Sequence, residues 1–221
     1  MKTIPVLVLI FNLLTVDSVK AEINAKDIIK LAPNLSPEVI VLAVQAFNCA
    51  NNDSNSTSNN FNIIDYSLPS TEKRFWSFDI INNKLLYHEL IAHGKNTGEN
   101  NAKYFSNIPN SKQSSLGLFK TGKTYTGRNG YSLYLNGLEK GFNDLALKRS
   151  IVMHGAGYVS QDFITKHGRL GRSWGCPAFE KKQAKEIINT IKQGQYLFIY
   201  YPDKNWLKNS TYLNCQNQSH I

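Results

Sequence analysis

A histidine and a glycine-flanked cysteine are the residues of this chain best suited to covalent chemistry. His154 follows the apolar run Ile151-Val152-Met153, and Cys176 lies in the segment Gly171-Arg172-Ser173-Trp174-Gly175-Cys176-Pro177. A thiol attacks a carbonyl only as a thiolate, so it needs a nearby base, and flanking glycines let a substrate approach closely. The separation of 176 minus 154, or 22 residues, allows a loop to leave one strand end and return beside it. The pair predicts a cysteine nucleophile, Cys176, with His154 as its base.

Short strands must position this pair. Stretches rich in β-branched and aromatic residues, punctuated by glycine and asparagine, predict strands at 61–66, 74–80, 84–91, 117–125, 131–135 and 196–201. Asn82-Asn83 predicts a hairpin turn. Residues 180–191 predict a helix, because Ala184, Ile187, Ile188 and Ile191 share one helical face. The fold is therefore expected to be mainly β, with a few peripheral helices.

The N-terminus has the pattern of a cleavable secretory signal. Met1-Lys2 precedes an apolar run at residues 4–11, and Val19 and Ala21 fit a small-x-small cleavage site. The run is shorter than the roughly 20 residues that span a bilayer, although an uncleaved anchor is the alternative. We expect a signal peptide at 1–21 and a periplasmic or secreted mature protein of 221 minus 21, or 200, residues without stable membrane insertion.

The mature chain divides into three predicted segments. Ser36-Pro37 begins a helix with a serine cap and a proline in the first turn, and residues 48–62 are crowded with asparagine and serine. Residues 22–62 are therefore predicted to be an N-terminal helix and linker. Residues 63–203 form the catalytic domain, and residues 204–221 form a C-terminal tail.

The composition is ordinary for a globular domain, but the charge is not. The chain carries a formal net charge of +9, of which Lys2, Lys20 and Asp17 contribute 2 minus 1, so the mature chain keeps +8. Nucleic acid is the usual partner of such a balance, yet a secreted protein rarely meets it. Peptides with free carboxylates are a better match for that compartment, so no nucleic-acid partner is expected.

Three cysteines in an oxidising compartment leave one unpaired thiol if a disulfide forms. Cys49 and Cys215 lie near the two ends of the mature chain, outside the glycine-rich motif, so we expect them to pair. Cys176 is then free. The alternatives are three reduced cysteines or a disulfide that includes Cys176, since sequence alone does not fix connectivity.

With these residues the chain resembles the murein L,D-transpeptidases, whose YkuD-like domain has a strand-end histidine and a downstream Ser-x-Gly-Cys motif. The matching segments are Ser173-Trp174-Gly175-Cys176, Ser114-Ser115-Leu116-Gly117-Leu118-Phe119, Asp65-Tyr66-Ser67-Leu68-Pro69-Ser70 and Phe105-Ser106-Asn107. The motif Gly-Arg-Ser-Trp-Gly-Cys-Pro resembles one subfamily in particular. The resemblance covers roughly residues 60 to 203 and implies a β-sandwich that acts on the peptide stems of peptidoglycan as acyl donor and acceptor.

Several neighbours of the pair are expected to bind substrate or support the base. The carbonyl of Gly155 could orient His154, and the backbone amides of Gly175 and Cys176 could stabilise an oxyanion, because Pro177 has no N–H. The further predicted binding residues are Ser173, Trp174, Arg172, Arg169 and His93. Ala178 stands where the wider family has a polar residue, so Arg172 or Arg169 would have to bind a substrate carboxylate. No metal site or cofactor is predicted, because the chain lacks His-x-x-x-His and Cys-x-x-Cys patterns.

Three functions remain open from the sequence. A cysteine-dependent L,D-transpeptidase would pass a thioester acyl-enzyme to an amine and so form or remodel cross-links. An L,D-carboxypeptidase or other hydrolase of wall peptides would use the same residues with water as acceptor. A non-enzymatic wall-binding module is disfavoured, because the nucleophile and base are both present.

Overall fold

The computed structural model describes residues 23–52 and 58–215. The predicted signal peptide at 1–21 lies outside these residues. Within them, no helix has the length and apolar character needed to cross a bilayer.

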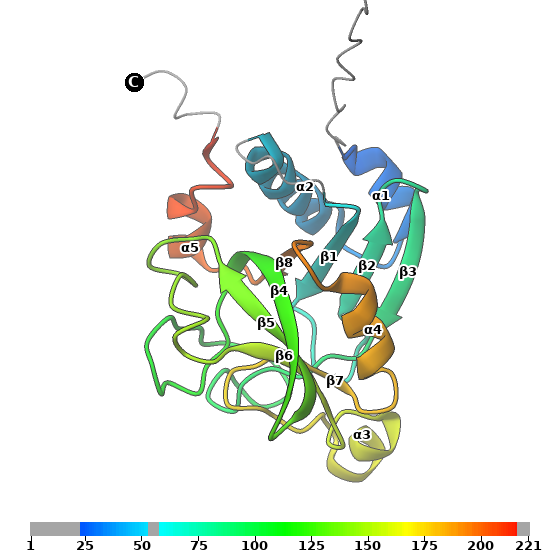
Figure 1. Cartoon of the computed structure of the whole chain (residues 1–221), viewed down its shortest axis with the longest axis vertical. Helices are drawn as coiled ribbons and strands as arrows, with labels where there is room; N and C mark the ends of the chain where they lie inside the picture. Colours follow the sequence, from blue (N-terminus) through cyan, green and yellow to red (C-terminus); the bar gives the residue numbers. More distant parts are fainter. Residues whose placement is uncertain (1–22, 53–57, 216–221) are drawn as a thin grey trace, which may run out of the picture.

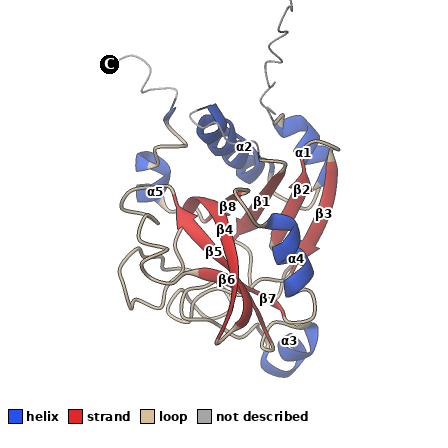
Figure 2. Ribbon diagram, in the orientation of Figure 1, coloured by secondary structure: helices blue, strands red, loops and turns tan. Residues whose placement is uncertain are grey.

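Five helices and eight strands are described within these ranges. The helices are α1 (Ala25–Leu31), α2 (Pro37–Asn52), α3 (Gln161–His167), α4 (Ala184–Ile191) and α5 (Lys204–Asn209). The strands are β1 (Asn60–Asp65), β2 (Phe75–Asp79), β3 (Lys84–Glu89), β4 (Gly117–Gly127), β5 (Gly130–Gly137), β6 (Val152–Ala156), β7 (Ala178–Glu180) and β8 (Tyr196–Tyr200). Figure 1 shows α1 and α2 at one end of the molecule and α3 at the other. Strands occupy the centre and helices the periphery, which confirms the predicted mainly β class (Figure 2).

All eight strands belong to one sheet, in the order β3-β2-β1-β8-β4-β5-β6-β7. β1 pairs with β8, and β6 with β7, in parallel, while the other neighbours are antiparallel. The chain just after β3 then bridges to the opposite edge, where Ala92 and Ala178 exchange two backbone hydrogen bonds. This bridge pairs part of the β7 edge with the segment that follows β3, close to the cysteine.

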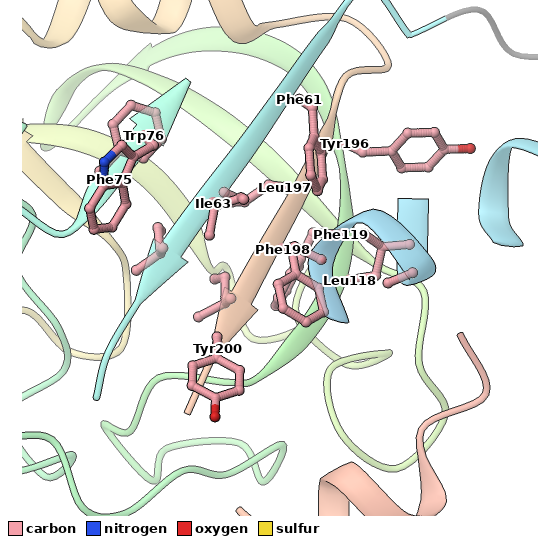
Figure 3. Close-up of a cluster of buried hydrophobic side chains, with 14 of the residues drawn as sticks. Phe61, Ile63, Phe75, Trp76, Leu118, Phe119, Tyr196, Leu197, Phe198 and Tyr200 are labelled. Carbon is pink, nitrogen blue, oxygen red and sulfur yellow. The ribbon is translucent and has the colours of Figure 1, made fainter. Parts of the chain in front are cut away.

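The core lies around the central strands. β8 is buried at every position, as expected for a strand covered on both faces. Helix α2 packs on β1 and β8, and α4 packs on β1, β5 and β6. Figure 3 shows the resulting cluster, which includes Phe61, Ile63, Phe75, Trp76, Leu118, Phe119, Leu197 and Phe198. These residues fix the strands that carry the site.

The local sequence explains where the peripheral elements begin and end. α2 begins at Pro37 and α4 buries its predicted apolar face, as the sequence indicates. Asn83 takes a left-handed φ of 51° in the turn between β2 and β3. Helix α3, which the sequence analysis missed, is capped by the side chain of Ser160 and ends at Gly168 with φ 71°. At seven residues it is too short for a clear periodic pattern.

The structure corrects the predicted linker and tail. α2 continues to Asn52 and β1 already begins at Asn60, so the boundary at residue 62 falls inside a strand. The C-terminal segment is packed as well, because Trp206 of α5 is fully buried and its Nε1 donates to Glu139 Oε2 at 3.0 Å. These segments were predicted to be unpacked because they are rich in asparagine. They nevertheless contain apolar residues, such as Trp206, that pack against the rest of the protein.

The predicted disulfide is present. Cys49 of α2 is bonded to Cys215, with a Cα–Cα distance of 6.3 Å and a sequence separation of 166 residues. It ties the C-terminal segment to α2, and Cys176 is the free cysteine among the residues that the structure describes. A cross-link over so long a loop restricts the unfolded chain strongly.

Candidate active site

Strands β6 and β7 place the histidine next to the cysteine loop. In their parallel register His154 lies opposite Ala178, and its backbone N–H donates to the carbonyl of Pro177 at 3.4 Å. Cys176 immediately precedes this paired segment. The 21 residues between them complete β6 and then form α3 and a return loop, so the strand pairing brings the histidine close to the cysteine segment despite their separation in the sequence.

The loop that carries the cysteine is held by two serine side chains. Ser173 Oγ donates to the carbonyl of Cys176 at 2.6 Å and accepts the N–H of Gly175 at 3.0 Å. Ser114 Oγ donates to the carbonyl of Gly175 at 3.0 Å and accepts the N–H of Gly94, also at 3.0 Å. Gly175 has φ 126°, a conformation that side chains disfavour, and a Cβ there would lie 2.8 Å from the carbonyl oxygen of Gln113. The glycine is therefore required for the shape of the loop.

The half-buried thiol of Cys176 faces the backbone just before β6. Its Sγ lies 3.5 Å from the N–H of Val152 and 3.7 Å from the carbonyl of Ser150. Burial raises the pKa of Cys176, although the N–H of Val152 and the positive charge of Arg149 offset part of that rise. The resting group is therefore a neutral thiol at pH 7 rather than a preformed thiolate.

His154 is held as a neutral base. Its Nδ1 lies 3.1 Å from the carbonyl of Gly155, and because a carbonyl only accepts, Nδ1 carries the proton and Nε2 the lone pair. Burial lowers the pKa of His154, while the Gly155 carbonyl acts in the opposite direction. Among the described residues Nε2 has no hydrogen-bond partner, and it is free to take a proton.

This arrangement predicts how the thiol responds to pH. Alkylation of Cys176 by iodoacetamide should be slow at pH 7 and should rise with one ionisation at a pKa above that of an ordinary cysteine, because burial disfavours the thiolate. The rate is measured by intact-mass spectrometry from pH 5 to 10. A fast, pH-independent rate down to pH 5 would instead indicate a thiolate-imidazolium pair and contradict this description.

The pair opens into a cavity of about 500 Å³. It is lined by Arg128, Asn129, His154, Gly155, Ala156, Gly157, Tyr158, Arg172, Ser173, Trp174 and Cys176. Trp174 is 70% exposed, so it forms a wall of the site and is not core packing. Burial and the neighbouring Cys176 raise the pKa of Tyr158 to about 12, which keeps its phenol protonated. Within the described residues, no cluster of three or more His, Cys, Asp or Glu side chains is arranged to hold a metal.

Three predicted binding residues do not act as free groups in this cavity. Arg169 and Arg172 both pair with Glu99, at 3.0 and 2.6 Å, and Arg172 also donates to the carbonyls of Lys95 and Gly98. Arg172 lines the cavity but its charge is compensated, while Arg169 is not part of the lining.

His93 is the third, and the structure corrects its predicted place in the cleft. It is buried outside the lining, with Nδ1 2.8 Å from Nη2 of the fully buried Arg74 and Nε2 3.3 Å from the carbonyl of Gly98. Burial and the charge of Arg74 lower the pKa of His93 to about 3. The carbonyl of His93 accepts the N–H of Ser173 at 3.0 Å, so this residue supports the loop from below.

The sequence analysis missed two contributors to the site. Tyr158 lies four residues after His154, and Gly171 lets it pack there, since a Cβ on that glycine would meet the Tyr158 side chain at 2.4 Å. Arg149 lies close enough to interact with Cys176 electrostatically. Both are adjacent to the His154 strand, but a tyrosine or arginine near a strand carries no distinctive pattern of its own.

With the geometry described, the chain can be compared with known proteins. Residues 31–200 match the family described as L,D-transpeptidase catalytic domain. Comparison with curated proteins gives no significant match. The family match includes every residue of the site described above.

Solved structures give distant similarities. An L,D-transpeptidase from Mycobacterium smegmatis is 11% identical with a TM-score of 0.41, over 66% of this chain and 61% of that one. The helical cell shape determining protein Pgp2 from Campylobacter jejuni is 13% identical with a TM-score of 0.40, over 74% and 56%. An L,D-transpeptidase from Stackebrandtia nassauensis is 11% identical with a TM-score of 0.40, over 81% and 77%. The chain spans about six-tenths of the length of the first two transpeptidases that it resembles.

Proposed function

Because the chain belongs to the L,D-transpeptidase catalytic domain family, we propose that it is a peptidoglycan L,D-transpeptidase with Cys176 as nucleophile and His154 as base. The observation that carries the proposal is the geometry of the cavity, where a neutral imidazole with a free Nε2 and a half-buried thiol line one wall. This is what a thiol needs when it is activated only as the substrate arrives.

The reaction then proceeds in two steps. His154 Nε2 takes the proton from Cys176, and Sγ attacks the carbonyl of an L-centre in a stem peptide. The amide bond to the following D-amino acid breaks, the proton passes to the leaving amine, and a thioester remains on Cys176. An amine from a neighbouring stem attacks the thioester and regenerates the thiol.

Two groups are suited to stabilise the oxyanion of the tetrahedral intermediate. The N–H of Cys176 donates to no group in residues 23–52 and 58–215, whereas the N–H of Gly175, also predicted as a donor, is bonded to Ser173 Oγ. The protonated phenol of Tyr158 lines the same cavity. In comparable acyl transfers, removal of one such donor costs about 3 to 4 kcal/mol of transition-state stabilisation. We assign this role to Cys176 and Tyr158 in place of Gly175.

Water in place of the amine would give an L,D-carboxypeptidase with the same residues. The exposed Trp174 and the open cavity leave room for a second stem beside the thioester, which favours the transpeptidase. Proteins of this family act on the cell wall, so the proposed setting is the cell envelope, periplasmic or secreted, with cleavage of the N-terminal signal at residue 21.

Defined muropeptides test the proposal. Mature protein is incubated with a tetrapeptide-stem donor, with and without an amine-bearing acceptor, and the products are resolved by mass spectrometry. We expect release of the terminal D-amino acid together with a cross-linked product that depends on the acceptor. Trimming alone, unaffected by acceptor, would identify a carboxypeptidase, and unchanged peptides would contradict an enzymatic role on these stems.

A further inference from the structure

A second, smaller cavity is also lined by Trp174. It has a volume of about 150 Å³ and is lined by Asn110, Lys112, Arg149, Ile151 and Trp174. Trp174 lines both cavities, so the small cavity adjoins the one that contains Cys176 at this side chain. The larger cavity contains His154, and the smaller one contains two cationic side chains.

Arg149 contributes a positive charge that pairs with no carboxylate in the described part of the chain. Its guanidinium donates to the carbonyls of Ser106 and Gln113 and to the hydroxyls of Ser111 and Ser115, all of them neutral. The buried Nε has no hydrogen-bond partner among the residues that the structure describes. Arg149 is therefore rigidly held yet keeps its full charge and one unused donor.

Lys112 contributes the second charge. Its Nζ lies 5.1 Å from the centre of the Trp174 ring, a cation-π distance, and it forms no ion pair with any residue that the structure describes. Arg169 and Arg172, by contrast, are both paired with Glu99. Arg128 of the large cavity also forms no ion pair among the described residues, but it is a single such cation. The small cavity is distinguished by two cations that no described carboxylate pairs with, whereas the arginines of the cysteine motif are both paired.

We propose that this small cavity is the carboxylate subsite of the enzyme, in which Lys112 and Arg149 bind the terminal carboxylate of the acyl donor. The proposal rests on the function proposed above and identifies the cavity that takes the leaving D-amino acid. The large cavity then holds the part of the stem that stays on Cys176.

The length of the substrate's terminal residue fits this assignment. In a tetrapeptide stem the terminal carboxylate is one residue beyond the carbonyl under attack, a span of roughly 3.3 to 3.6 Å per residue. Sγ lies 3.7 Å from the carbonyl of Ser150, the residue that follows Arg149, and the Arg149 charge is close enough to lower the pKa of the thiol. A carboxylate bound beside Arg149 would therefore hold the scissile carbonyl near Sγ.

Lys112→Met is the most informative variant. It removes one charge while keeping a long apolar side chain over Trp174, and it leaves the backbone carbonyl of Lys112, which accepts the N–H of Asn96, unchanged. Arg149 joins the 106–115 segment to the site, so its replacement could disturb the fold. Lys148→Met is the matched control, because it removes the same charge one residue from Arg149 on an exposed side chain outside the cavity.

The first measurement does not depend on the natural reaction. The alkylation rates of Cys176 by iodoacetate and by iodoacetamide are compared, because the two reagents differ in their negative charge. In the wild type and Lys148→Met we expect iodoacetate to be favoured, and in Lys112→Met the ratio of the two rates should fall by about threefold or more. An unchanged ratio in Lys112→Met would overturn the subsite.

The second measurement uses two donors, a tetrapeptide stem with a free terminal carboxylate and the same stem with a terminal carboxamide. The wild type should prefer the acid in kcat/KM, and Lys112→Met should lose most of that preference. Equal preferences in both proteins would overturn the assignment to the donor carboxylate. If neither donor reacts while the alkylation ratio still falls, the proposed function fails but the anion subsite stands.

Discussion

Replacement of Cys176 by serine is expected to reduce release of the terminal D-amino acid by at least about 1,000-fold. A serine hydroxyl is far less acidic than a thiol, and His154 is a weak base whose pKa burial lowers further. Nothing else in the cavity supplies a comparable nucleophile. Ser173 has only a hydroxyl, Tyr158 has a protonated phenol, and His154 is assigned as the base. The other lining residues are Arg128, Asn129, Gly155, Ala156, Gly157, Arg172 and Trp174. Turnover is followed by mass spectrometry of the released product.

The serine variant should fold normally, since the half-buried thiol packs at the margin of the core and its polar contacts are to the backbone of Ser150 and Val152, which a hydroxyl can also make. A thermal midpoint close to that of the wild type is the control. Turnover within tenfold of the wild type in a folded Cys176→Ser protein would show that another residue is the nucleophile.

Replacement of His154 by glutamine should reduce kcat/KM by about 100-fold to 10,000-fold, the usual contribution of a positioned general base. The glutamine amide can still donate to the carbonyl of Gly155, so the variant tests the lone pair on Nε2 and not the anchoring contact. The fold should be retained.

The role of His154 as a base also predicts how kcat/KM changes with pH. His154 must be neutral to accept the proton, and burial lowers its pKa, so wild-type kcat/KM should rise with pH through an ionisation below 6.5 and stay high at neutral pH. His154→Gln should lose this acid limb. A variant that keeps both the limb and most of its activity would assign the base to another group.

The sequence was sufficient for the residues whose chemistry is distinctive. A cysteine among glycines together with a histidine after an apolar run is typical of a catalytic pair. Their spacing allows one loop to leave the histidine strand and return beside it. The strands before and after the site, at 131–135 and 196–201, could be placed because apolar and turn residues alternate clearly there, whereas the three-residue strand β7 was not predicted. These local signals are why Cys176 and His154 could be singled out, and in the structure both residues line the same cavity.

The substrate-binding residues could not be predicted in the same way, because the role of each depends on contacts with residues that are distant in the sequence. Arg172 lies in the motif and lines the cavity, yet Glu99 compensates its charge, while Arg149 keeps its charge because it meets only carbonyls and hydroxyls. His93 follows an apolar run in the sequence much as His154 does, but it contacts Arg74 and is buried outside the cavity lining. Such differences come from tertiary contacts and leave no pattern in the chain.

The most direct test of the account is to trap the covalent intermediate. Wild-type protein is mixed with the tetrapeptide-stem donor, quenched in acid within the first turnovers and measured by intact-mass spectrometry. We expect a mass increase equal to the donor minus the released amino acid, located on the peptide that contains Cys176 and removed by hydroxylamine. Donor cleavage with no adduct on Cys176, or an adduct on a different residue, would contradict it.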